Sequence, residues 1–302
     1  RDVAPSPRVE QSLKHIGKFI MYIGIVPYKL RKTKKLGQLH VDQLVWPHKK
    51  PSNALHVRDL GKNDHIVIFP YSKTLLTANA QVNCKVSLVI FEPRAIQARY
   101  YNIIPILRFL YHNILVRDPK LASKYNNVHS LSLAMLSVET DNLRLPDFSH
   151  RRGISLIASM KNDLEGHNLR HKLISFDKSH DHQLLTPLGR AYEQFDDMVA
   201  ALAPFRYSVV IENCIEPHLF TEKILNCLAC KTIPIYWGHE TVKQYFDTSN
   251  WLLFNDLEDG YEKIKFASSG EHIVSHDKIH ENFVQAKSYK NLYKRMSERI
   301  TE

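Results

Sequence analysis

Residues 207–238, YSVVIENCIEPHLFTEKILNCLACKTIPIYWG, contain a strand, a helix and a second strand in succession. Residues 207–211 are rich in β-branched side chains, which predicts a buried strand of a parallel sheet. A polar loop separates this strand from a helical pattern over residues 220–230, and an apolar strand follows over residues 232–237. This order of elements is the repeating unit of an α/β fold.

The same alternation extends in both directions along the chain. Further strands are predicted at residues 19–26, 65–69, 85–91, 154–159 and 251–254, and helices at residues 96–112 and 169–176.

Three domains follow from this pattern. An N-terminal α/β domain is predicted over residues 1–148, and it begins with a polar arm over residues 1–16. A second α/β domain is predicted over residues 149–275, after a linker-like stretch with a proline and little periodicity. Residues 276–302 are predicted to form an amphipathic C-terminal helix that packs back across both domains.

Composition and charge narrow the classes of ligand. The chain has 302 residues, 44% hydrophobic and 24% charged, as in a globular protein. Its net charge of +10 favours anionic ligands such as nucleic acid, acidic lipid or phosphorylated small molecules. The densest basic run, residues 29–35, contains no aromatic side chain on which bases could stack, so we expect a solvated loop and no nucleic-acid partner. No apolar run reaches roughly 18 residues, so no transmembrane segment is expected.

The spacing of cysteine and histidine predicts no metal site. Cys227 and Cys230 form a C-x-x-C pair, but no second pair supplies the two further ligands that zinc needs, so we expect reduced thiols in a helix core. The sequence His180-Asp181-His182 is typical of a solvated loop, and no D-x-D motif suited to a divalent cation is present.

Polar residues follow the strand 207–211 and open the next helix. Glu212 and Asn213 stand at the carboxyl end of the strand, where parallel sheets bind ligands. Thr221, Glu222 and Lys223 occupy the first helical turn, whose unpaired N–H groups and partial positive charge attract phosphate. Lys223 adds a full charge for a diphosphate, and Glu222 can accept hydrogen bonds from sugar hydroxyls. The alternative is an ordinary helix start, with Thr221 as the cap and Lys223 in solvent.

Three submotifs of this segment resemble the signature of the α-1,3-fucosyltransferases, glycosyltransferase family ten. They are I-E-N (residues 211–213), L-F-T-E-K (219–223) and T-I-P-I-Y-W-G (232–238), in the order and spacing of that family. Gly166-His167-x-x-Arg170 looks like the family's position for an arginine that meets the donor phosphates, and Leu188-Gly189-Arg190 resembles its glycine turn. This part of the resemblance covers about residues 154–260.

A weaker resemblance covers residues 85–120. Glu92-Pro93 is similar to the family's E-x-P, in which the glutamate is the catalytic base, and Val116-Arg117-Asp118 resembles the R-x-D-like segment that follows it. A strand-end carboxylate that faces solvent is the alternative for Glu92. For Arg170 and Asn213 the alternatives are a surface helix arginine and a turn cap.

The resemblance implies a GT-B fold of two facing Rossmann-like domains, and an inverting transferase that needs neither a metal nor a bound cofactor. It implies that L-fucose moves from GDP-fucose to a hydroxyl of an oligosaccharide or glycoconjugate acceptor, with Glu92 removing the acceptor proton. The positions that match the family's donor site are Arg170, Gly189, Glu212, Asn213, Thr221, Glu222 and Lys223.

Two departures from the family pattern touch the donor site. Leu219 stands where many members have a tyrosine, and Asp196-Asp197 replaces a region that often carries a lysine. A UDP- or GDP-linked hexose or a pentose such as xylose therefore stays open as the donor, as does a catalytically silent nucleotide- or carbohydrate-binding module. The basic, cysteine-poor N-terminal half favours a cytoplasmic location over a Golgi-lumenal domain whose anchor would precede Arg1.

Overall fold

Two parallel β-sheets form the framework of the protein. The computed structural model describes residues 21–180 and 183–302, and the polar arm predicted over residues 1–16 lies outside these ranges. The chain divides into two compact units, one with the described residues up to Val89 and Pro105–Ile114, the other with Ile90–Ile104 and Leu115–Glu302. The domain boundaries predicted after residues 148 and 275 stay predictions.

The first sheet has five strands in the order β1-β2-β3-β4-β5. β1 pairs with β2 and β2 with β3 in parallel, and His65 of β2 stands opposite both Ile23 and Lys85. The strands are β1 (Ile23–Ile25), β2 (His65–Ile68), β3 (Lys85–Val89), β4 (Ile114–Val116) and β5 (Val128–Ser130), and the helices between the last three are α2 (Arg94–Asn102), α3 (Ile104–Leu107) and α4 (Pro119–Ala122).

The helix predicted over residues 96–112 is shorter than expected and broken. Gln97 has non-helical backbone angles inside α2 (φ −118°, ψ 27°), and α2 ends at Asn102. α3 then makes a single turn, and the chain enters β4 at Ile114. Apolar periodicity alone does not reveal such interruptions, because buried residues continue on the same face across them.

The second sheet also has five strands, in the order β10-β9-β8-β6-β7, and all of its pairings are parallel. Pro187 is accommodated in β7 because β7 is an edge strand, where a missing N–H breaks no inner ladder. The strands are β6 (Ile154–Ile157), β7 (Leu185–Leu188), β8 (Tyr207–Ile211), β9 (Ile233–Trp237) and β10 (Leu252–Leu253).

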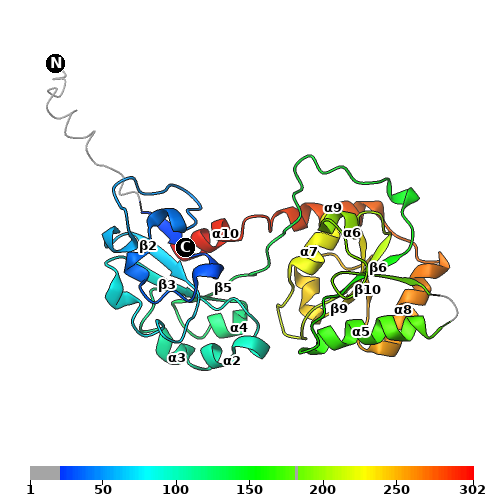
Figure 1. Cartoon of the computed structure of the whole chain (residues 1–302), viewed down its shortest axis with the longest axis horizontal. Helices are drawn as coiled ribbons and strands as arrows, with labels where there is room; N and C mark the ends of the chain where they lie inside the picture. The colour runs from blue at the N-terminus through cyan, green and yellow to red at the C-terminus, as the bar shows by residue number, and fades with distance from the viewer. Residues whose placement is uncertain (1–20, 181–182) are drawn as a thin grey trace, which may run out of the picture. The chain divides into compact units, whose positions relative to one another are not determined.

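Helices cover both faces of the second sheet (Figure 1). α5 (Glu165–Lys178) and α8 (Leu257–Ser269) pack on one face, against Val209 and Ile211 of β8. α6 (Met198–Leu202) and α7 (Glu222–Ala229) pack on the other face, against Val210. Neighbouring residues of β8 therefore enter opposite cores, which explains why the whole strand is apolar. The core between the sheet and helices α6 and α7 contains the thiols of Cys227 and Cys230, which are free and buried as predicted.

The C-terminal segment is helical and amphipathic, as predicted, but it forms two helices. α9 (His276–Lys287) packs on α7, and α10 (Leu292–Thr301) follows after a break. Asn291 creates the break because its side chain accepts a hydrogen bond from the N–H of Lys294 at 2.9 Å and caps α10. Arg295 then donates to the carbonyl oxygen of Ser132 at 2.6 Å, which ties α10 to the segment after β5.

The connecting loops contain short 3₁₀ helices: Tyr28–Leu30, Leu36–Gln38, Val41–Gln43, Val57–Asp59, Asn79–Gln81, Phe148–His150 and Glu240–Gln244. In the basic run that begins at Lys29, all four lysines are exposed, as expected for a solvated loop. No helix in residues 21–180 and 183–302 combines the length and the apolar character needed to cross a lipid bilayer. Within the same ranges, no cluster of three or more His, Cys, Asp or Glu side chains could hold a metal ion.

Candidate functional site

A pocket of about 320 Å³ opens at the carboxyl ends of β6 and β8. Its polar side chains come mostly from α5, α7 and the loops that follow β6 and β8, and α6 and β8 supply most of its apolar wall. Four of the residues predicted from the sequence meet in this one pocket: Arg170, Asn213, Glu222 and Lys223. It is also lined by Ile157, Ser159, Lys161, His167, Met198, Leu202, residues 208–211 and Asn226.

Arg170 holds the end of β8 from the first half of α5. Its Nη2 donates to the carbonyl oxygen of Ile211 and, at 3.3 Å, to Oδ1 of Asn213. Burial lowers the pKa of this guanidinium, an effect that the nearby carboxylates oppose, but an arginine stays charged at neutral pH. A guanidinium carries five N–H donors, so Arg170 can hold the strand end and an anion at the same time. The alternative of a surface arginine is wrong, because Arg170 is only 6% exposed.

Gly166 lets α5 approach the strand end. Its N–H donates to the carbonyl oxygen of Asn213 at 3.1 Å. A Cβ at this position would stand 1.7 Å from the carbonyl oxygen of Glu212, so any other residue would push the helix away. The close contact places the first turns of α5 directly against the polar residues that follow β8.

Glu212 has no exposed surface and supports the start of α7. Its Oε1 accepts a hydrogen bond from the N–H of Thr221 at 2.9 Å, and its Oε2 accepts from the hydroxyl of Thr221 at 2.7 Å. Thr221 is the N-cap of α7, because its Oγ1 accepts from the N–H of Lys223. Neither Glu212 nor Thr221 lines the pocket, so their position is behind its wall, where they fix the helix start.

Lys223 lies among oxygen atoms at the edge of the pocket. Its Nζ is 3.1 Å from Oγ1 of Thr221, 3.6 Å from Oε2 of Glu212 and 3.5 Å from Oε1 of Glu222. The alternative of an ordinary helix start is right for Thr221 as the cap, whereas the side chain of Lys223, 27% exposed against 53% for Glu222, lies only partly in solvent. The flexible stem of a lysine allows the ammonium group to turn from these partners towards an anion in the pocket.

Sequence reasoning missed two ionisable residues of the pocket, His167 and Lys161. His167 is buried, and its Nδ1 is 2.7 Å from Oδ1 of Asp163. Burial lowers the pKa of His167, although the Asp163 carboxylate opposes the shift, so the ring is neutral at pH 7 and Nε2 is its acceptor nitrogen. A signal was present, because His167 and Arg170 stand three residues apart and therefore share a face of α5.

Like Glu212 and Thr221, two further predicted site residues, Gly189 and Glu92, do not line the pocket. Gly189 follows β7 with a φ of +114°, and a Cβ there would stand 2.2 Å from the carbonyl oxygen of Ala158. Glycine is thus required where the ends of β6 and β7 come together. Glu92 follows β3 in the first sheet, half-buried, just before α2.

The residues that depart from the family pattern have structural positions of their own. Leu219 is buried and does not line the pocket. Asp197 caps α6 by accepting a hydrogen bond from the N–H of Ala200 at 2.8 Å. Neither departure therefore places a polar group inside the pocket.

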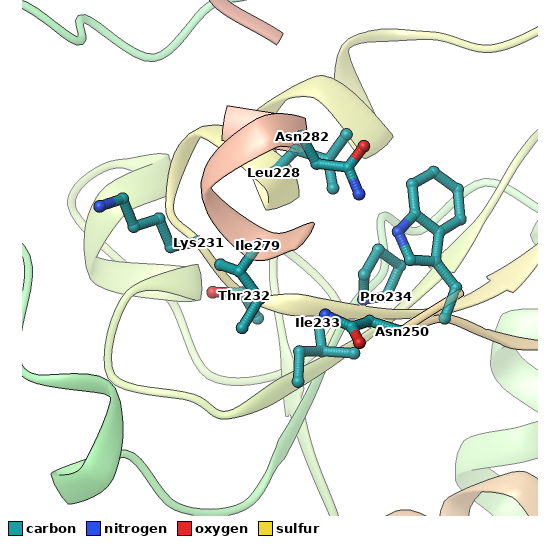
Figure 2. A pocket seen from close by; sticks show the side chains of 9 residues that line it. Leu228, Lys231, Thr232, Ile233, Pro234, Asn250, Ile279 and Asn282 are labelled. Carbon is teal, nitrogen blue, oxygen red and sulfur yellow. The ribbon is translucent and has the colours of Figure 1, made fainter. Parts of the chain in front are cut away.

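A second cavity, between β9, α7 and α9, is too small for an organic ligand (Figure 2). Its volume is about 10 Å³, enough for one water molecule. Asn250 and Asn282, which line it, hydrogen-bond to the backbone of Ser275 and Asp247. These bonds hold α9 in place. The cavity also lies at the amino end of β9, whereas ligands of parallel sheets bind at the carboxyl ends.

Comparison with solved structures finds this fold in glycosyltransferases. A crystal structure of an α1,3-fucosyltransferase has a TM-score of 0.53 at 16% identity, and the match covers 80% of this chain and 79% of that chain. The structure of an α1,3-fucosyltransferase with GDP has a TM-score of 0.52 at 15% identity, covering 82% and 81%. A UDP-forming trehalose-phosphate synthase from Burkholderia xenovorans has a TM-score of 0.55 at 11% identity, covering 80% and 75%.

These matches confirm the predicted GT-B fold class, with two parallel α/β sheets. They also agree with the resemblance to the α-1,3-fucosyltransferases at the level of the fold. No protein-family model and no curated protein matches the chain.

Proposed function

We propose that this protein is a glycosyltransferase that takes a sugar from a nucleotide diphosphate donor. The observation that carries the proposal is the pocket at the carboxyl ends of β6 and β8, which Arg170 and Lys223 enter from two different helices. Three cations, with Lys161 as the third, and the amino ends of two helices around one pocket form an environment for a diphosphate. The neutral His167 and the exposed carboxylate of Glu222 add hydrogen-bond acceptors for ribose or sugar hydroxyls.

The proposed reaction is a single displacement with inversion at the anomeric carbon. The acceptor oxygen forms the new bond to this carbon, and the bond from the carbon to the diphosphate oxygen breaks. Glu92, which resembles the family's base, takes the proton of the acceptor hydroxyl. Arg170 and Lys223 stabilise the negative charge that develops on the departing diphosphate, the role for which a metal would otherwise be needed.

GDP-fucose is the donor that we propose. Its support is the ordered set of submotifs around Glu212 and Thr221, together with a fold neighbour whose structure contains GDP. A UDP-linked sugar is the second candidate, because the UDP-forming trehalose-phosphate synthase has a similar TM-score. The acceptor is proposed to be a hydroxyl of an oligosaccharide or glycoconjugate.

The proposal is tested with the whole chain and a panel of GDP- and UDP-sugars. We expect GDP to raise the melting temperature more than UDP does, and GDP-fucose to be the donor from which nucleoside diphosphate is released. Release of nucleoside diphosphate from UDP-sugars alone would mean that the donor is a UDP-sugar. Binding without release from any donor would indicate a catalytically silent binding module.

A pair of lysine variants tests the pocket itself. Lys223→Ala should weaken GDP binding by about 1–3 kcal/mol, the range for a lost charge-assisted hydrogen bond. Lys263→Ala removes the same charge from α8, where Lys263 pairs with Asp259, and should leave the affinity for GDP unchanged. Equal affinities in the two variants would show that the diphosphate binds elsewhere.

A further inference from the structure

The backbone around Glu92 is held by buried side chains on both sides. The N–H of Glu92 donates to Oε1 of Gln97 at 3.2 Å, and the carbonyl oxygen of Glu92 accepts from the hydroxyl of Tyr101 at 3.1 Å. Nη2 of Arg117 donates to the carbonyl oxygen of Phe91 at 2.8 Å. Both peptide planes that flank the Cα of Glu92 are therefore fixed, so the direction of its Cα–Cβ bond is fixed as well.

The three side chains come from different places in the chain and are all buried. Gln97 and Tyr101 are both buried residues of α2, and Arg117 follows β4. Their exposed fractions are 9%, 3% and 5%. Burial raises the pKa of Tyr101 to about 12, so its hydroxyl keeps the proton that it donates throughout the neutral range.

This arrangement has two energetic costs. Gln97 leaves helical geometry inside α2. Within residues 21–180 and 183–302, Nε and Nη1 of buried Arg117 have no hydrogen-bond partner. An unpaired N–H in the interior destabilises a fold, so the bond from Arg117 to Phe91 is formed at a cost in stability.

From this geometry we infer that Gln97, Tyr101 and Arg117 are positioning residues for the carboxylate of Glu92. The inference rests on the proposed function, in which Glu92 removes the acceptor proton. On a fixed Cα–Cβ bond, only the side-chain torsions of Glu92 remain to align its carboxylate with the acceptor hydroxyl, which limits the misplaced orientations of the base. The three residues then act on the rate of proton removal and have no part in holding the nucleotide.

Tyr101→Phe tests the inference, and Tyr111→Phe is its matched control. Tyr111 is as buried as Tyr101, and its hydroxyl likewise donates to a carbonyl oxygen, that of Leu75, at 2.7 Å. The two variants lose the same kind of bond and should unfold at similarly lowered temperatures. The activity to measure is GDP release from GDP-fucose with water as the acceptor, in the full chain.

We expect Tyr101→Phe to lower the maximal rate of release by about 10- to 100-fold, the scale of a misplacement near 1 Å, with an unchanged Kd for GDP. Tyr111→Phe should keep the wild-type rate. A Glu92→Gln background should keep only a slow residual release that does not use the base, and there Tyr101→Phe should leave the residual rate unchanged, because it acts only through Glu92.

Three results would overturn the inference, and each points to a different cause. Equal rates for Tyr101→Phe and Tyr111→Phe, with Glu92→Gln reduced to its residual rate, would reject the positioning role alone. A further loss from Tyr101→Phe in the Glu92→Gln background would show that Tyr101 acts by another route. Full release by Glu92→Gln, or no release by the wild-type chain, would reject the base or the proposed function, and with it the premise of the inference.

Discussion

Glu212 supplies a negative charge next to the cations of the pocket. A buried carboxylate is costly unless it is paired, and here it accepts two hydrogen bonds from Thr221 and lies 3.6 Å from the ammonium group of Lys223. Glu212 thereby places a buried negative charge beside the cations of the pocket. The family-like E-N and T-E-K submotifs are therefore one unit, in which the glutamate orders the helix start that carries the lysine.

His65 makes the stability of the protein depend on pH. It is buried in β2, and its Nε2 is 2.7 Å from the hydroxyl of Ser87. Burial, together with the positive charges of His112 and Lys85, lowers the pKa of His65 from 6.5 to about 3. Between these pH values the unfolded chain binds a proton at His65 that the folded chain does not. The contribution of His65 to the unfolding free energy is therefore fully present above pH 6.5 and is lost as the pH falls towards 3.

The prediction is that wild-type protein loses up to about 1.4 kcal/mol of unfolding free energy per pH unit through His65 in this window. His65→Gln removes the titrating group. In urea unfolding from pH 8 to pH 4, the difference in unfolding free energy between wild type and variant should therefore become smaller as the pH falls. The packing cost of the substitution is measured at pH 8, where His65 is neutral in both states. Parallel curves would show that His65 does not titrate as described.

At the scale of elements, the contact between α5 and the end of β8 depends on one glycine. The Cβ of an alanine at position 166 would stand 1.7 Å from the carbonyl oxygen of Glu212 and 3.1 Å from the Cα of Asn213, both of them backbone atoms. Backbone cannot turn aside as a flexible side chain does, so α5 must shift. Arg170 would move with it, away from the pocket.

Gly166→Ala should therefore lower the unfolding free energy by about 1–3 kcal/mol and weaken GDP binding at the same time. The control is Gly61→Ala, because the nearest atom to its added Cβ is a carboxylate oxygen of Asp64 at 3.5 Å, an ordinary contact. Urea unfolding and calorimetric titration with GDP measure the two effects. A stable Gly166→Ala variant with full affinity for GDP would contradict the close contact.

Some elements could be predicted from the sequence and others could not. β8 begins and ends at the residues predicted for its strand. Its five successive side chains are all buried, on two faces of the sheet, and therefore form a clear apolar run in the sequence. β4, β5 and α6 have three to five residues, too few for a period to show. α8 went unpredicted although it has 13 residues, and its N-cap Asp256 and C-cap Gly270 are signals that sequence reasoning could have used.

At the scale of the whole molecule, the candidate site was predictable where one segment supplies both strand end and helix start. Asn213, Glu222 and Lys223 belong to that segment, and Arg170 followed from a family motif. The burial of Glu212 behind the wall could not be predicted, because strand-end position does not tell which way a side chain turns. Lys161 stands in a loop, without any period, and only the folded chain brings it to the pocket.

All residues that line the pocket belong to β6, β8, α5, α6, α7 and their loops. Nucleotide binding should therefore protect the elements of the second sheet from hydrogen exchange more than those of the first. We predict that GDP slows hydrogen exchange in the first turns of α5 and α7 and at the end of β8. GDP at 100 times its Kd stabilises the folded state by about 2.7 kcal/mol, enough to slow exchange about 100-fold wherever opening requires the nucleotide to leave.

The strands of the first sheet provide the internal comparison for this experiment. Amides of β2, such as those of Ile66–Ile68, pair only within that sheet, so their local openings should be insensitive to GDP. The full chain is compared with the Lys223→Ala variant at the same GDP concentration, where protection in α5 and α7 should fall while β2 exchanges as before. Equal protection of β2 and α7 in the wild-type chain would mean that the two sheets open together, and the prediction that GDP protects the second sheet selectively would be wrong.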